Sequence, residues 1–252
     1  MSTELTVPVS EYTALAHSSL AEVSDYNCET PSFGDLIRVS TPTGGGQFWS
    51  VGEDAEKEIT GILCFYTPRG ILWPTDGEGS GKDTPVLETH DLKTAYQMSS
   101  DMGDLESKVL DEALMDDDGS GYVKYNWQTL GYNQWGSGKG RGKRTREQRI
   151  LGILRPGDVM PILVNVSPGS VKAMSKFIIQ NFNQQGKRFF EGVVTLGLKK
   201  AKSAGGIEYS QIAPSVNEYL EADAAEVIRT SFTDPLKAEF DRTMFENAMR
   251  TS

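Results

Sequence analysis

One turn in the second half of the chain constrains the fold more than any other feature. Its sequence is Arg155-Pro156-Gly157-Asp158, and apolar, β-branched runs lie on both sides of it, at residues 150–154 and 159–166. Proline presets the backbone for a turn and glycine tolerates the positive φ that tight turns use, so the segment predicts two paired strands. Any fold assigned to this chain must contain a hairpin here.

The segment after this hairpin carries the signals of a helix start. Ser167 has the composition of an N-cap, and Pro168 fits the first helical position, where its missing N–H is tolerated. Apolar residues then recur at helical spacing as far as Gly186, namely Val171, Met174, Ile178 and Phe182. The pattern predicts a helix of about four to five turns.

Two further strands are predicted after the helix, at residues 189–198 and 207–212, with lysines and glycines connecting them. The order is therefore strand, strand, helix, strand, strand. An OB-fold, a five-stranded Greek-key barrel, places its helix between the third and fourth strands. Residues 58–66 or 122–127 would supply an earlier strand. We therefore expect a mainly β protein with added helices, built on an OB-fold that occupies residues 35–215.

The ends of the chain are expected to lie outside the barrel. Residues 1–34 are rich in Ser, Thr and Glu and predict an N-terminal arm. Residues 216–252 predict a helical tail, interrupted at Pro235, with Tyr219, Ala224, Ile228 and Phe232 on one side. Two roles are open to this tail, because it would either dock on the barrel or pair with another subunit in a homo-oligomer.

The first half of the barrel region contains strand-like and loop-like segments. Residues 35–40 and 58–66 have the β-branched and aromatic character of strands and are candidates to pair with each other. Two polar or glycine-rich insertions, at about residues 74–120 and 128–149, are expected to be surface loops.

A dense basic segment lies beside aromatic residues within an acidic chain whose formal net charge is −10. The aromatic residues are Tyr125, Trp127, Tyr132 and Trp135, and the cations are Lys139, Arg141, Lys143, Arg144, Arg146 and Arg149. Interleaved glycines disfavour a regular helix and permit a close approach of the backbone to a ligand. Stacking surfaces beside cations that neutralise phosphate are what a single-stranded nucleic acid requires, so the segment predicts a local binding patch.

Each candidate residue also has an ordinary structural interpretation. The cations would otherwise be solvated, or would form ion pairs with the acidic residues 116–118. Trp127 lies in a candidate strand and is expected in the core, which leaves Trp135 and Tyr132 as the stacking candidates. The lysines of the last hairpin, Lys199, Lys200 and Lys202, are either a polar loop or second-rank phosphate contacts at the edge of a ligand groove.

The chain carries no recognisable catalytic or metal signature, so we expect neither an enzyme nor a cofactor. Cys28 and Cys64 lie in unlike contexts far from either histidine, which indicates neither a disulfide framework nor a zinc site and favours a reducing compartment. The Asp-Asp-Asp-Gly run at 116–119 lacks the alternating ligands of a calcium loop. The start of the chain has no signal-peptide pattern and no run is long enough to span a membrane, so a cytoplasmic protein is expected.

Several motifs taken together resemble a known family. They are WGSGKGRGKRTREQR, ILGILRPGDVMPILVNVSPGSVKAMSKFI and VVTLGLKKAKSAGGIEYSQI, within residues 125–215. This region resembles OB-fold single-stranded DNA-binding proteins encoded by bacteriophages and mobile elements. The resemblance implies a role in DNA replication and recombination in the host cytoplasm, with single-stranded DNA and replication or recombination proteins as partners.

This chain departs from the resemblance at one point. Many relatives carry cysteines around the glycine-rich loop, consistent with bound zinc, whereas the corresponding regions here contain none. The resemblance then implies that packing and hydrogen bonds hold the loop, or that DNA orders it.

Two functions other than DNA binding are compatible with the sequence. The first is a non-enzymatic, virion-associated or protein-interaction module whose basic loop docks on an acidic protein surface. The second is a metal-dependent nuclease using carboxylates such as Asp76, Asp83 or Asp116, although these lie in loops without a ligand arrangement.

Overall fold

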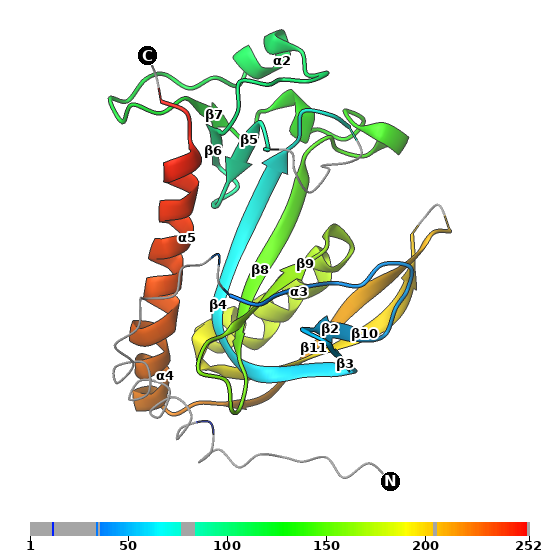
Figure 1. Ribbon diagram of the computed structural model, residues 1–252, viewed down its shortest axis with the longest axis vertical. Helices are drawn as coiled ribbons and strands as arrows, with labels where there is room; N and C mark the ends of the chain where they lie inside the picture. The colour runs from blue at the N-terminus through cyan, green and yellow to red at the C-terminus, as the bar shows by residue number, and fades with distance from the viewer. Residues whose placement is uncertain (1–11, 13–33, 35, 77–83, 204–205, 251–252) are drawn as a thin grey trace. The chain divides into compact units, whose positions relative to one another are not determined.

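The computed structural model describes residues 12, 34, 36–76, 84–203 and 206–250. The chain forms two compact units (Figure 1). The first unit contains the residues up to Tyr66 and Ile150–Glu239, and the second contains Thr67–Arg149 and the residues from Phe240 onward. Of the predicted arm over 1–34, only Tyr12 and Gly34 are among the described residues. No helix in the described ranges is long and apolar enough to cross a membrane.

The first unit is built on a mixed sheet whose strand order is β1-β9-β8-β4-β10-β11. The strands are β1 (Arg38–Ser40), β4 (Glu58–Leu72), β8 (Arg146–Leu154), β9 (Ile162–Val166), β10 (Gly192–Lys202) and β11 (Glu208–Tyr219), and β4 and β8 continue into the second unit. Strand β10 is antiparallel to both β4 and β11, whereas β1 is parallel to β9.

The sheet is open, so the predicted closed barrel is not confirmed. Within the described residues, β11 pairs with β10 alone, and the outer edge of β9 is occupied by β1. The predicted pairing of residues 35–40 with 58–66 is also wrong, because both edges of β4 are taken by β8 and β10. The class that the structure supports is a mainly β protein with a few helices.

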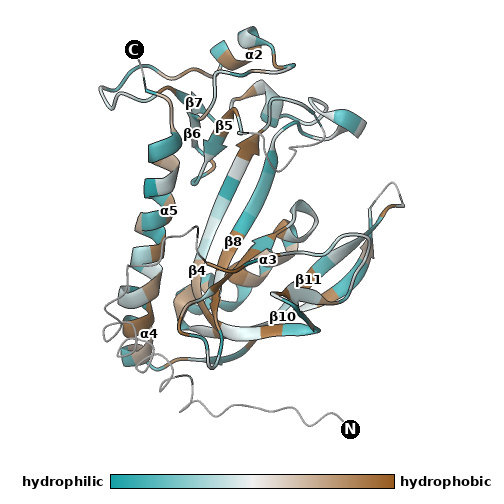
Figure 2. Ribbon diagram, viewed as in Figure 1, coloured by the Kyte–Doolittle hydropathy of each residue, from teal (hydrophilic) through white to brown (hydrophobic). Residues whose placement is uncertain are grey.

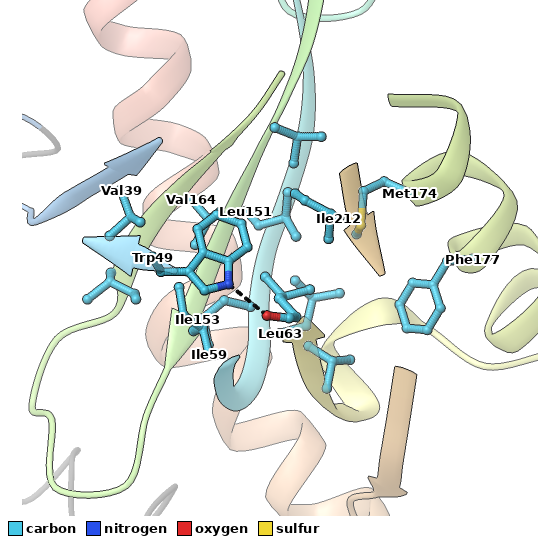
Figure 3. Close-up of a cluster of buried hydrophobic side chains, with 14 of the residues drawn as sticks. Val39, Trp49, Ile59, Leu63, Leu151, Ile153, Val164, Met174, Phe177 and Ile212 are labelled. Atoms are coloured by element: carbon cyan, nitrogen blue, oxygen red, sulfur yellow. Dashed lines mark hydrogen bonds between the residues drawn. The ribbon is translucent and has the colours of Figure 1, made fainter. Parts of the chain in front are cut away.

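The core of the first unit is apolar. A separate hairpin of β2 (Trp49–Val51) and β3 (Asp54–Glu56) contributes Trp49, which is completely buried. Its indole N–H donates a hydrogen bond of 2.9 Å to the Leu196 carbonyl, drawn dashed in Figure 3. The same cluster of buried side chains includes Val39, Leu63, Leu151, Ile153, Val164, Met174, Phe177 and Ile212 (Figure 3). Figure 2 shows the hydrophobic residues along β4 and β8.

The predicted hairpin and helix of the second half are confirmed. Strands β8 and β9 pair, and the Asp158 N–H donates to the Arg155 carbonyl across the turn. Helix α3 (Pro168–Asn181) begins after Ser167, and short 3₁₀ turns η3 (Asn183–Gln185) and η4 (Phe189–Glu191) follow it. Between the two turns, Gly186 adopts the left-handed conformation expected at the end of a helical segment.

The C-terminal helix begins later than predicted and is interrupted by a π-helical turn directly before Asp234 and Pro235. Strand β11 continues to Tyr219, because its register with β10 runs that far and Val216 and Tyr219 pack on the core. Helix α4 (Ala222–Ile228) then leads through the π-helical turn η5 (Arg229–Thr233) into α5 (Asp234–Asn247). Pro235 is the second residue of α5 and follows this π-helical turn, so the predicted interruption at Pro235 coincides with the irregular turn.

The second unit has its own core, contrary to the prediction of surface loops. The end of β4 continues into an antiparallel series of β5 (Leu87–Thr89), β6 (Thr94–Gln97) and β7 (Lys124–Asn126), accompanied by α2 (Ser107–Asp111). Leu87, Leu105, Leu110, Trp127 and Leu130 pack together, which confirms that Trp127 is a core residue. The apolar residues of this region are too few per segment to show periodicity, and only their assembly makes a core.

Candidate nucleic-acid interface

The basic segment forms a defined loop in the second unit, here called the glycine loop (residues 131–145). It contains the 3₁₀ turns η1 (Gly131–Asn133) and η2 (Lys139–Arg141). The N–H groups of Gly136 and Gly138 each donate to the Gly142 carbonyl at 3.0 Å. Gly136 and Gly140 have φ values of +94° and +64°, a region that residues with a Cβ rarely adopt. Hydrogen bonds and glycine geometry therefore hold the loop in one shape.

Buried polar groups fasten the glycine loop to the core of its unit. The side chain of Asn133 donates to the Trp127 carbonyl at 3.0 Å and accepts from the Thr145 hydroxyl at 2.8 Å. The Ser137 hydroxyl lies 2.8 Å from the Tyr132 carbonyl and accepts the Arg144 N–H at 3.0 Å. These bonds connect the base of the loop to its unit, although two buried donors beside them, Trp127 Nε1 and Arg144 Nε, have no hydrogen-bond partner among the described residues.

The two aromatic residues predicted to stack on bases have different surroundings. Trp135 is 80% exposed at the tip of the loop. Tyr132 is partly buried against the core, its hydroxyl accepts the Glu106 N–H at 2.6 Å, and the Arg144 guanidinium lies 6.0 Å from its ring centroid. Trp135 therefore offers a stacking surface, whereas Tyr132 supports the loop from below.

Arg144 does not lie on the surface as the sequence prediction required. Its side chain is 7% exposed, donates to the Pro74 carbonyl at 2.9 Å and forms an ion pair with Asp104. The hydrogen bond from Arg144 lowers the pKa of the Asp104 carboxyl. These contacts all use Nη2, while Nε is buried without a hydrogen-bond partner among the described residues. Because the side chain is buried and bonded in this way, we assign Arg144 to anchoring the glycine loop.

The other cations of the segment are engaged to different degrees. Lys139 donates from its ammonium to the Asp76 carbonyl at 2.7 Å, and Lys143 lies 3.7 Å from the Glu147 carboxylate. Arg146 is exposed, and Arg149 donates to the Gln148 carbonyl at 2.8 Å. The side chain of Arg141 is outside the described residues. After the carboxylates Asp76, Asp104 and Glu147 are counted against the six cations, an excess of three positive charges remains.

Asp76 and Asp104, and not the acidic run at 116–118, are the acidic neighbours of the glycine loop. Asp118 instead forms an ion pair of 2.6 Å with Lys124. As for the nuclease hypothesis, Asp76 accepts the Lys139 N–H, Asp116 is exposed, and Asp83 lies outside the described residues. Within the described residues, no group of three His, Cys, Asp or Glu side chains is arranged to hold a metal.

The second predicted basic cluster is the end of the β10–β11 hairpin in the first unit, here called the lysine hairpin (residues 198–202 and 208–212). Its three lysines lie in strand β10 and not in a connecting loop, so their side chains alternate between the two faces. Lys199 and Lys200 are exposed and, within the described residues, form no ion pair. Lys202 pairs with Glu208 at 3.4 Å while 70% exposed. These cations remain accessible to phosphate.

One ionic cluster in the second unit has no recognisable signal in the sequence. Arg69 binds the buried Glu88 carboxylate through two hydrogen bonds of 2.7 and 2.8 Å, and His90 lies 2.9 Å from the same carboxylate. The other ring nitrogen of His90 faces Asp241 at 3.3 Å, and its ring stacks on Phe240 at 3.7 Å. Burial would raise the pKa of Glu88, but the bonds from His90 and Arg69 outweigh it and lower the pKa to about 2. The cluster stabilises this unit.

Comparison with known proteins yields no match to any family model, curated protein or solved structure.

Proposed function

We propose that this protein binds single-stranded DNA with little sequence preference and acts in the replication or recombination of a phage or mobile element. The observation that carries the proposal is Trp135, an indole 80% exposed at the tip of a loop fixed by hydrogen bonds. A preformed loop keeps this ring presented, so stacking on a base costs little ordering of the protein. The excess positive charge of the surrounding segment would attract the DNA backbone.

The strand order of the first unit supports the same proposal. If β4, β8, β9, β10 and β11 are taken as strands one to five of an OB-fold, α3 falls between strands three and four as that fold requires. Oligonucleotides bind OB-folds through the loops after strands one and four, among other surfaces. The glycine loop belongs to the first of these connections and the lysine hairpin borders the second. We therefore propose an open OB-fold in which β1 occupies the edge of strand three.

Replacing Trp135 tests the proposal directly. We expect Trp135→Ala to weaken binding of labelled oligo-dT by roughly five- to a hundredfold, the range for one stacked base. Trp135→Phe retains an aromatic face and should recover most of the affinity. Fluorescence anisotropy of the labelled DNA measures binding, and the melting temperature should stay unchanged because the side chain is exposed. Equal affinity of the Ala variant and the unmodified protein would refute the site.

The same measurement separates DNA binding from docking on an acidic protein. Titrations with oligo-dT, oligo-rU and duplex DNA at two salt concentrations should show preference for a single strand and a loss of affinity with salt. An absence of binding to every nucleic acid would favour the protein-interaction alternative for the basic loop.

A further inference from the structure

A small open pocket lies beside Phe48 in the first unit, away from the core. Its volume is about 270 Å³, and its lining comprises Gln47, Phe48, Lys57, Glu58, Gly197, Leu198 and Ala213. Phe48 is 53% exposed, although its neighbour Trp49 is fully buried and bonded to the Leu196 carbonyl. The anchored Trp49 therefore fixes the position of an aromatic ring that the core does not use. Small-molecule sites usually exceed roughly 300 Å³, so this pocket suits one flat group and not a whole cofactor.

Two small residues, Gly197 and Ala213, are part of the pocket lining on the sheet. Gly197 lies opposite Glu58 on β4 and opposite Ala213 on β11, which places the three residues in one row across the sheet. Lys199 shares this face of β10, two residues further along. Gly197 leaves the space above the sheet open, since a methyl group at this position would meet its nearest atom, Glu58 Oε1, at 3.5 Å.

The polar groups around this pocket are not engaged by the protein. Within the described residues, neither the Glu58 carboxylate nor the Lys57 ammonium has a hydrogen bond or ion pair, and the same holds for Lys199. A carboxylate that accepts hydrogen bonds, beside an aromatic ring, matches a base with an exocyclic amino group, since Glu accepts from cytosine N4. The two ammonium groups match the phosphates on either side of such a base.

We infer that this pocket is a second DNA-contact site, which holds one base of the strand against Phe48 and favours cytosine over thymine through Glu58. The inference rests on the proposed function and adds to it a place where the protein distinguishes bases. Phe48 supplies the apolar contact, Gly197 leaves room for the base, and Lys57 and Lys199 bind the backbone. Thymine presents the carbonyl oxygen O4 where cytosine presents its N4 amino group, so the Glu58 carboxylate would repel thymine.

The inference is tested by measuring how three variants, alongside Trp135→Ala, bind oligo-dC and oligo-dT of equal length. Phe48→Ala should weaken binding of both oligonucleotides by roughly five- to a hundredfold. Glu58→Ala should lower the ratio of dC to dT affinity several-fold. Glu53→Ala is the matched control, because Glu53 is an exposed carboxylate of the same unit outside the pocket. It removes the same charge and should change both affinities equally. Thermal melting confirms that each variant is folded.

The outcomes separate this inference from the proposed function. If Trp135→Ala loses affinity but Phe48→Ala does not, the pocket is not a DNA site and the proposed function stands. An unchanged dC to dT ratio in Glu58→Ala would overturn base discrimination by the carboxylate. Failure of the unmodified protein to bind either oligonucleotide would overturn both the proposed function and the inference.

Discussion

The two units use their charged residues in opposite ways. Among the described residues, the charged side chains that are buried, Glu88, His90 and Arg144, all belong to the second unit. The first unit has an apolar core and leaves its hairpin lysines in solvent. The glycine loop has the denser basic sequence, yet part of its charge is used to hold the loop. A cluster of cations in a sequence therefore indicates a ligand surface only when the structure leaves those cations unoccupied.

The largest effect should come from Glu88. Its pKa in the folded protein, about 2, lies below the ordinary 4.5, so the unfolded state binds more protons between these values. Its contribution, roughly 3 kcal/mol from the size of the shift, is fully present above pH 4.5 and is lost as the pH falls towards 2. Urea denaturation should show Glu88→Gln less stable than the unmodified protein at pH 7, with the difference shrinking at pH 3.

Glu53→Gln serves as the control for Glu88, because it removes an exposed carboxylate of the first unit. It should leave stability unchanged at both pH values. If Glu88→Gln lowers the free energy of unfolding by the same amount at pH 7 and pH 3, the carboxylate stabilises the protein through its shape and not through its charge.

Arg144 should produce the next largest effect. Arg144→Met removes a buried donor that bonds the Asp104 carboxylate and is one of two donors to the Pro74 carbonyl, the other being the Asp104 N–H. We expect a loss of about 1–3 kcal/mol in the free energy of unfolding. Lys199→Met removes an exposed cation from the other unit and should change stability by less than about 0.5 kcal/mol. Chemical denaturation measures the free energy of unfolding of both variants. If the two variants are equally stable and only Arg144→Met loses DNA binding, Arg144 contacts DNA and does not anchor the loop.

A matched pair of double variants compares the two basic clusters as DNA contacts. Lys199→Ala with Lys200→Ala should reduce the slope of log affinity against log salt by about 1.4, or 0.7 for each phosphate contact. Lys139→Ala with Lys143→Ala removes the same charge, but these ammonium groups already bind Asp76 and Asn133. The slope of log affinity against log salt should therefore change less in this second double variant than in the first. A larger change for the second pair would reverse the comparison.

The smallest effect is expected at the exposed pair of Lys202 and Glu208. Glu208→Gln frees Lys202, but exposed ion pairs are weak and screened, so affinity for oligo-dT should rise by only about twofold at low salt. The gain should vanish at high salt. A decrease in affinity would show that Glu208 supports the hairpin in some other way.

The predictions from sequence succeeded where the signal was local. The turn at 155–158, the start of α3 at Pro168 and the burial of Trp127 each depend on a few neighbouring residues. The predicted barrel is not confirmed, because its closure would require pairing between β9 and β11, and β1 occupies the edge of β9 instead. The core of the second unit was missed because it is assembled from short segments far apart in the chain.

The same division applies to the candidate sites. Composition was enough to identify the basic segment and the exposed position of Trp135, because glycines around an indole leave it little to pack against. Composition does not distinguish Phe48 from its neighbour Trp49, whereas in the structure Trp49 is fully buried and Phe48 is 53% exposed.

Sequence alone therefore determined the residue types available for a ligand, the turns, the start of α3 and the abundance of strands. Tertiary structure decided which cations are free, which aromatic rings are exposed and how the strands pair. The physical reason is that a cation or an aromatic ring can contact a ligand only if no distant residue already forms an ion pair with it or packs over it. Asp104 lies 40 positions from Arg144 along the chain, and only folding brings the two together.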